Sequence, residues 1–239
     1  MTELLFREDP YAQSCEAQVV AINGRGGVVL DRTVFYATSG GQPGDSGTMA
    51  RDSGRIAIAT TVYGDTKSDI VHVPAQGQPL PSPGERVKLE LDWQKRHAYM
   101  RIHTALHLLC ALVPFPVTGG QISHDGGRLD FDIPDPGAVD RAILSQEINR
   151  LIREDHPVLA SFISDEDLIA KPEIVRTMSV KPPMGTGQVR LVGIGKNGEI
   201  DLQPCGGTHV RSTGEIGAVS VGKLESKGKQ NRRIRISFA

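Results

Sequence analysis

Short apolar runs separated by turn-forming residues fill roughly the first 90 positions, a pattern typical of β-strands. The run over residues 17–22 ends at Asn23-Gly24, a pair that favours a tight hairpin turn, and the run over 27–30 follows as its partner. Strands at such close spacing predict a small barrel or sandwich. Further strands are expected at 33–37, 55–63, 69–73 and 86–91.

The pattern changes at Asp92, where a long stretch free of glycine and proline begins. Asp92 is a residue type that caps helices, and Pro114 ends the stretch, so we predict one helix over 93–113. A second helix is expected from Asp135-Pro136 to about Arg153, because aspartate followed by proline is typical of a helix start. Strands are expected at 129–133, 158–163, 189–194, 200–202, 218–224 and 233–238, with a short helix at 166–170.

This change of pattern divides the chain into two expected domains, a β-domain over 1–91 and an α+β domain over 92–239. In the second domain we expect a largely antiparallel sheet packed on two helices. The chain has 239 residues, 38% of them hydrophobic, which is enough for a core without disulfide bonds. The sequence has neither an apolar run of about 18 residues nor a signal-peptide pattern, so we expect no membrane span. Its three cysteines are odd in number and widely spaced, so we expect a reducing, cytoplasmic compartment.

Two pairs of metal-binding residue types stand out. His103 and His107 lie four residues apart on the first predicted helix and therefore share one face. Cys205 and His209 have the same separation within Cys-Gly-Gly-Thr-His, where glycines allow both side chains to turn toward one point. A mixture of imidazole and thiolate donors favours zinc. We therefore predict one zinc ion per chain.

The ligand set leaves two alternatives open. Cys110 lies near the same helix face as His103 and could replace Cys205, although its apolar neighbours place it in the core. Four protein ligands make a closed structural site, whereas three leave a position for water or substrate. Position 104 is threonine rather than the glutamate of H-E-x-x-H proteases, which disfavours peptide hydrolysis by that route.

Positive charge gathers near the C-terminus. Six lysines and arginines and a single glutamate fall between positions 223 and 235, in a chain of formal net charge −1. Such a cluster binds phosphates through salt-dependent contacts, and its alternative is a solvated hairpin. Arg96 and Arg101 on the first helix could extend it. The candidate RNA contacts are Lys223, Lys227, Lys229, Arg232 and Arg233.

The motif Arg101-Ile-His103-Thr-Ala-Leu-His107, followed about a hundred residues later by Cys205-Gly-Gly-Thr-His209, resembles the editing domain of alanyl-tRNA synthetase. Ser39-Gly-Gly-Gln-Pro-Gly-Asp-Ser-Gly47 resembles the glycine motif of the β-domain that precedes it in that family. Further motifs that fit are Arg128-Leu-Asp-Phe-Asp132, Thr213-Gly-Glu-Ile-Gly217 and the Arg232-Arg233-Ile-Arg235 tail. The chain has no room for a synthetase catalytic domain, and it is similar to the medium-length, freestanding AlaX-type editing proteins.

This resemblance implies the fold class α+β, with a small N-terminal β-barrel followed by a zinc-binding editing domain. It implies hydrolysis of Ser-tRNA(Ala) at the aminoacyl ester, with Gly-tRNA(Ala) as a second candidate substrate. An alanine pocket cannot exclude glycine well and rejects a hydroxyl-bearing analogue only about a hundredfold, so a second site is needed. The partner would be tRNA; we expect a monomer with no obligate protein partner.

The resemblance also implies roles for individual residues. His103, His107, Cys205 and His209 would be both zinc ligands and catalytic residues. Gly40, Gly41, Thr104 and Gln121 would contact the substrate. For Thr104, the alternative is a hydroxyl that is satisfied by its own helix backbone.

Three other functions stay open at this point. The chain could be a zinc-stabilised RNA-binding module without catalysis, or a hydrolase of another small ester or amide. It could also edit another aminoacyl-tRNA such as threonyl-tRNA, although the glycine motif at Gly40-Gly41 favours the alanine side.

Overall fold

In the computed structural model, which describes residues 2–66, 68–178, 185 and 187–239, the chain divides into two units, Met1–Ala98 and Tyr99–Ala239. The boundary falls inside helix α2, Trp93–Leu112. The division expected at residue 92 stays a prediction.

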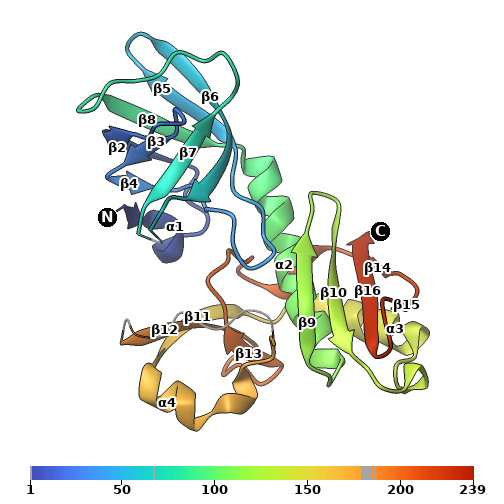
Figure 1. Ribbon diagram of the computed structural model, residues 1–239. Helices are drawn as coiled ribbons and strands as arrows, with labels where there is room; N and C mark the ends of the chain where they lie inside the picture. The colour runs from blue at the N-terminus through green and yellow to red at the C-terminus, as the bar shows by residue number, and fades with distance from the viewer. Residues whose placement is uncertain (1, 67, 179–184, 186) are drawn as a thin grey trace. The chain divides into compact units, whose positions relative to one another are not determined.

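Six antiparallel strands of the first unit close into a barrel, in the spatial order β2, β3, β7, β6, β5, β8 (Figure 1). Their bounds are β2 Ser14–Ile22, β3 Val28–Leu30, β5 Gly47–Arg51, β6 Gly54–Tyr63, β7 Ile70–Pro74 and β8 Arg86–Leu91. Alternate side chains point inward: Val87, Leu89 and Leu91 of β8 are buried, whereas Arg86 and Lys88 are exposed. The predicted barrel is therefore confirmed. Helix α1, Leu5–Glu8, and strand β5 carried no recognised sequence signal.

The strand expected at 33–37 is wrong beyond Thr33. Only Arg32–Thr33 forms a strand, β4, which pairs in parallel with β1, Glu3–Leu4. Residues 34–37 are buried, but the Tyr36 amide donates to the Asp45 carboxylate over 2.6 Å instead of to a neighbouring strand. Burial rather than strand pairing therefore explains this apolar run.

The glycine-rich segment between β4 and β5 forms a tight turn. Ser39 and Gln42 exchange backbone hydrogen bonds of 3.1 and 2.9 Å. Gly40 and Gly41 between them have φ of 56° and 84°, the positive values that a type I′ turn requires. Glycine is needed here because most other residues avoid this conformation.

Helix α2 confirms the predicted helix to within one residue. The Asp92 carboxylate accepts the Lys95 amide over 3.3 Å, as a capping residue does, and the helix ends two residues before Pro114. No helix among the described residues is long and apolar enough to cross a membrane. Arg96, in the first turns of α2, is fully buried, so it does not belong to an exposed basic surface.

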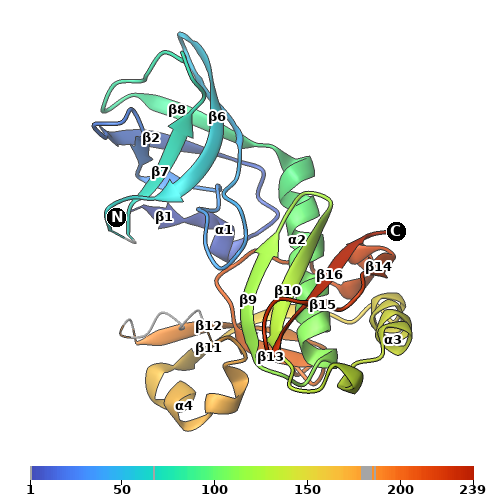
Figure 2. The same ribbon diagram turned by 45° about the vertical axis from the view of Figure 1, so that its right-hand side comes forward.

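The second unit contains two antiparallel sheets within the described residues (Figure 2). The larger has the order β14, β16, β10, β9, with β15 also paired to β16; the smaller has the order β11, β12, β13. The larger sheet comprises β9 Val117–Ile122, β10 Gly126–Asp132, β14 Val219–Val221, β15 Glu225–Ser226 and β16 Asn231–Phe238, and the smaller β11 Val158–Ser164, β12 Gln188–Ile194 and β13 Asp201–Pro204. The expectation of one sheet is thus wrong, because apolar periodicity identifies strands but not the distant partners they select.

The helices of this unit pack on different strands. Helix α3, Arg141–Arg153, contacts β14, and helix α4, Asp165–Ala170, contacts β11 and β12. Short 3-10 turns lie at Pro136–Ala138, Pro172–Ile174 and Thr213–Ile216. Helix α2 lies close to β10, since a Cβ at Gly127 would come within 2.7 Å of the Ile102 side chain.

The start predicted for the second helix is wrong by several residues. Asp135 accepts the Gly137 amide and caps only the 3-10 turn at Pro136–Ala138. Val139 is extended, with φ −126° and ψ 110°, which ends that turn. Asp140 then accepts the amides of Ala142 and Ile143 and caps α3. Two capping aspartates stand close together in the sequence, and the backbone at Val139 decides which one starts the helix.

Candidate metal centre

The two histidines of the predicted pair lie on one face of α2. His103 and His107 are both buried, and their ring centroids are 5.3 Å apart. This is the separation that four residues along a helix impose. The helix therefore presents two imidazoles together in the interior of the second unit.

Strand β13 and the turn after it supply the other donors. Side chains alternate along a strand, so Asp201, Gln203 and Cys205 follow one another on the same side. The Gly207 amide approaches the Cys205 Sγ at 3.4 Å. Arg190 of β12 donates through Nη1 to the carbonyl oxygens of Cys205 (2.7 Å) and Gly207 (3.1 Å), which fixes the shape of the turn.

These elements bring all four predicted ligands to one place. One donor atom from each of His103, His107, Cys205 and His209 lies within 4.8 Å of the other three. The Cys205 Sγ is 3.6 Å from the His103 Nε2 and 3.3 Å from the His209 Nε2. Tetrahedral zinc with bonds of about 2.0–2.3 Å requires donor atoms roughly 3.3–3.6 Å apart, so these two distances and the donor types fit a zinc ion.

Buried polar groups lie directly behind two of the four ligands. The His107 Nδ1 is 2.8 Å from the Asp201 Oδ2, and the Gln203 amide nitrogen donates to the same oxygen over 2.8 Å. The His209 Nδ1 is 3.1 Å from the Thr104 hydroxyl. Sequence reasoning missed Asp201, Gln203 and Arg190. Only the alternation of polar residues leading to Cys205 could have pointed to the first two.

The charges of the cluster favour a thiolate. Burial disfavours the charged form of Cys205, but the attraction of His103 and His209 outweighs it and holds the pKa of the thiol well below its usual value. Burial, reinforced by the charge of His103, lowers the pKa of His209 well below its usual value. At His107, burial is outweighed by Asp201 and Cys205, which raise the pKa to about 10. A thiolate beside imidazoles is the chemical state that a metal ligand needs.

Cys110 is not part of this cluster. Its side chain is buried, and desolvation raises the pKa of its thiol to about 11. An uncharged thiol of this kind behaves as a small apolar group.

The substrate-contact candidates lie in different elements. Gly40 and Gly41 form the tip of the turn in the first unit. Gln121 is exposed on β9, where its side-chain oxygen accepts the Arg128 Nε over 3.2 Å. Thr104 is fully buried beside His209. Their roles toward a substrate stay predictions.

The predicted basic cluster is a hairpin formed by β15 and β16, and its members differ in environment. Lys223, Lys227 and Lys229 are exposed, and Lys227 pairs with Glu225. Arg232 is buried and donates to the carbonyl oxygens of Gly228 and Lys229. Arg233 forms a two-pronged ion pair with Asp130.

Arg101 does not extend this hairpin as an exposed charge. Its guanidinium donates to the Ile216 carbonyl oxygen over 2.8 Å and lies 4.0 Å above the Phe238 ring. These contacts tie α2 to the C-terminal part of the second unit.

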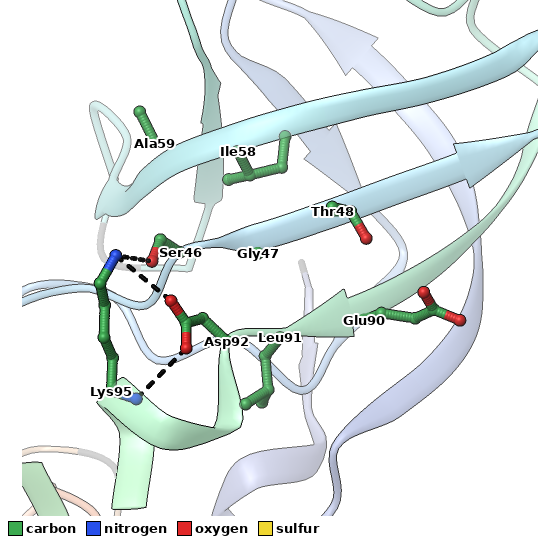
Figure 3. Close-up of a pocket in the computed structure, with 9 residues that line it drawn as sticks. All are labelled: Ser46, Gly47, Thr48, Ile58, Ala59, Glu90, Leu91, Asp92 and Lys95. Atoms are coloured by element: carbon green, nitrogen blue, oxygen red, sulfur yellow. Dashed lines mark hydrogen bonds and ion pairs between the residues drawn. The ribbon is translucent and has the colours of Figure 1, made fainter. Parts of the chain in front are cut away.

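The first unit carries a hollow of about 500 Å³ at the start of α2 (Figure 3). The Lys95 Nζ contacts both the Ser46 hydroxyl and the Asp92 carboxylate there, each over 3.2 Å. The hollow is lined by residues of β5, β6, β8 and α2, and none of the predicted site residues is among them.

Comparisons with known proteins place the chain among tRNA-related sequences. A family model described as "Threonyl and Alanyl tRNA synthetase second additional domain" matches residues 189–235, and one described as "tRNA synthetases class II (A)" matches residues 9–95. The chain is 35% identical over 245 residues to the alanyl-tRNA editing protein AlaX-M of Methanosarcina acetivorans, an alignment that covers 98% of each.

The chain also matches parts of two longer relatives. The chain is 34% identical to the alanyl-tRNA editing protein AlaX-L of Pyrococcus horikoshii, over 99% of this chain and 58% of that protein. It is also 34% identical to the alanine–tRNA ligase of Pyrobaculum arsenaticum, over 94% of this chain and 25% of that enzyme.

Proposed function

The chain belongs to the family of alanyl-tRNA editing proteins, and we propose that it hydrolyses the aminoacyl ester of mischarged alanine tRNA in trans. The observation that carries this proposal is the cluster of three buried imidazoles and the half-buried Cys205 sulfur. Its four residues belong to two motifs that lie about a hundred positions apart in the sequence. The match to AlaX-M over 98% of both chains supports the same function.

The proposed substrate is Ser-tRNA(Ala), with Gly-tRNA(Ala) as a second substrate. A pocket built for alanine rejects an added hydroxyl only about a hundredfold, so serine is activated by mistake. A separate site that hydrogen-bonds the serine hydroxyl can spare alanine by about 10⁴-fold, because its polar groups stay unpaired when alanine binds.

His103, His107, Cys205 and His209 would hold a zinc ion. When bound, zinc supplies a Lewis acid that polarises a carbonyl group or acidifies a water molecule. Cys205 then serves as a metal ligand and is not available as a nucleophile, so we propose direct hydrolysis rather than a covalent intermediate on this residue. The turn that carries Cys205 is held by Arg190, which keeps the thiolate directed toward the three imidazoles.

The β15–β16 hairpin is the proposed RNA surface. The exposed Lys223, Lys227 and Lys229 would contact phosphates. Arg232 would contribute by shaping the hairpin, since its guanidinium is engaged with backbone carbonyls of the turn. Gly40, Gly41 and Gln121 remain the proposed substrate contacts.

The test is deacylation of three preformed esters, Ser-tRNA(Ala), Gly-tRNA(Ala) and Ala-tRNA(Ala), by the purified full-length protein. We expect rapid loss of serine, slower loss of glycine and sparing of alanine. Cys205→Ala should lose both zinc and activity. Cys15→Ala is the matched control, because Cys15 is a half-buried cysteine of the barrel outside the cluster.

The opposite result separates the alternatives. A wild-type protein that holds one zinc per chain but releases none of the three amino acids faster than buffer would contradict the deacylase proposal. Binding of alanine tRNA by that protein would then indicate an RNA-binding module in which the metal is structural. Turnover of small esters without tRNA would indicate a hydrolase of another substrate class.

A further inference from the structure

We infer that Thr104 and Asp201 are positioning residues, which hold His209 and His107 with their Nε2 atoms directed toward the metal centre. Neither residue is a ligand itself, since the cluster of donor atoms is formed by the three histidines and Cys205. Each instead contacts the opposite ring nitrogen of one ligand. The inference assigns Thr104 a role other than the substrate contact that the sequence suggested.

One buried hydrogen bond joins Asp201 to His107. An ionised carboxylate can only accept, so the contact of 2.8 Å between its Oδ2 and the His107 Nδ1 requires a proton on that nitrogen. A metal ligand must be the neutral ring, and with the proton on Nδ1 its lone pair lies on Nε2, on the side of the ring that faces the cluster. Gln203 donates to the same carboxylate oxygen over 2.8 Å and holds it in place. Both Asp201 and Gln203 are buried, so water does not compete for these bonds.

The hydroxyl group of Thr104 uses all of its hydrogen-bonding capacity. A threonine hydroxyl has one proton to donate and two positions at which it accepts. The proton goes to the Met100 carbonyl oxygen over 2.9 Å. The two acceptor positions are filled by the His209 Nδ1 at 3.1 Å and by the Val210 amide at 3.3 Å.

Two consequences follow from this saturation. The His209 Nδ1 must carry a proton because the only proton of Thr104 is already donated, so the free lone pair of His209 lies on Nε2. The hydroxyl also has no bond left for the side chain of a substrate. Thr104 is fully buried, which is consistent with a role inside the protein rather than at a substrate surface.

The decisive measurement is the zinc affinity of the folded protein, obtained by competition with a chromogenic chelator. We expect Thr104→Val, which keeps the shape but removes the hydroxyl, to bind zinc about 10- to 100-fold more weakly. Thr104→Ser keeps the hydroxyl and should stay within about threefold of wild type. Asp201→Ala should lose about 10- to 100-fold, and Asp201→Asn, which keeps an acceptor oxygen, should lose less.

Matched variants separate positioning from general damage to the fold. Thr213 is also a fully buried threonine, and its hydroxyl donates to the Leu151 carbonyl and accepts the His156 amide. Thr213→Val removes the same kind of group without touching a ligand, so it should lower the stability but leave the zinc affinity of the folded protein unchanged. Asp130→Asn is the corresponding control for a buried carboxylate, because Asp130 pairs with Arg233.

A second arm, which depends on the proposed function, distinguishes the two roles of Thr104. If Thr104 positions His209, Thr104→Val at saturating zinc should keep the wild-type ratio of kcat/KM for Ser-tRNA(Ala) over Ala-tRNA(Ala). A collapse of that ratio with unchanged zinc affinity would overturn the inference for Thr104 and restore its role as a substrate contact. Unchanged zinc affinity in Asp201→Ala would overturn it for Asp201. Since zinc affinity is measured without tRNA, failure of the deacylase proposal would not affect this first test.

Discussion

Asp45 of the glycine-rich segment and Arg96 of α2 form a buried ion pair in which the guanidinium Nε lies 3.1 and 3.0 Å from the two carboxylate oxygens. The exposed fractions of the two side chains are 2% and 0%. Asp45 also accepts the Tyr36 amide, and Arg96 also donates to the carbonyl oxygens of Pro10 and Val34. One pair therefore joins three segments of the first unit that are far apart in the sequence.

We expect Asp45→Ala to destabilise the first unit by about 3–5 kcal/mol, because it leaves the Arg96 charge buried without its partner. Trp93, the single tryptophan, packs against the barrel core, so its fluorescence reports unfolding of this unit. Glu90→Ala is the control, since its ion pairs with Arg55 and Lys88 lie at the surface and their loss should cost much less stability. Equal losses in the two variants would contradict a special role for the buried pair.

Two glycines of the same segment should respond differently to alanine. A Cβ at Gly44 would lie 1.9 Å from the Thr61 carbonyl oxygen, so Gly44→Ala must displace backbone and should strongly lower the unfolding temperature. A Cβ at Gly40 meets no atom within 4 Å, and only its φ of 56° opposes the change, at a cost of about 1–2 kcal/mol. A stable Gly40→Ala protein with reduced deacylation would support the proposed substrate role of this turn.

The stability of the barrel should fall as the pH drops from about 6.5 to about 4. His72 is completely buried between Thr33 and the Val28 carbonyl, and desolvation lowers its pKa to about 4. In this window the unfolded chain binds a proton that the folded chain does not, so stability rises with pH and is fully present above 6.5. The slope from this group is about 1.4 kcal/mol per pH unit, on the order of 3 kcal/mol in all.

Denaturant titrations followed by Trp93 fluorescence at several pH values check this expectation. His72→Gln has no titrating group at this position, so the corresponding part of the slope should disappear. A variant that keeps the full wild-type slope would show that other groups cause the pH dependence.

In the β15–β16 hairpin, substitution of a lysine should affect tRNA binding, whereas substitution of Arg232 should affect stability. Lys223→Gln and Lys229→Gln should each weaken tRNA binding and reduce the slope of log K against log salt by about 1, without changing stability. Arg232→Gln should instead lower the unfolding temperature, because the Gly228 and Lys229 carbonyl oxygens lose their donor. Lys196→Gln, at an exposed turn elsewhere in this unit, is the control. Unchanged salt slopes in both lysine variants would exclude the hairpin as the RNA surface.

Features that depend on neighbours in the sequence were predictable without a structure. The bounds of α2 followed from the cap at Asp92 and the stop at Pro114, and strand β8 followed from strict alternation over 86–91. The two pairs of candidate metal ligands were also predictable, since His103 and His107 are joined by helix periodicity and Cys205 and His209 by a glycine turn. In each case the spacing along the chain fixes the spacing in space.

Features that depend on contacts between distant segments were decided only by the tertiary structure. Residues 34–37 have the pattern of a strand but lie in the core, where the Tyr36 amide donates to Asp45. The second half forms two sheets because β10 pairs with β16 while β11 pairs with β12. The sequence suggested that Arg96 and Arg232 are exposed charges, yet both are buried against partners that sequence patterns cannot identify. The contacts of Asp201 and Thr104 with the candidate metal ligands His107 and His209 likewise span about a hundred residues, so only the packing of α2 against the β13 segment creates them.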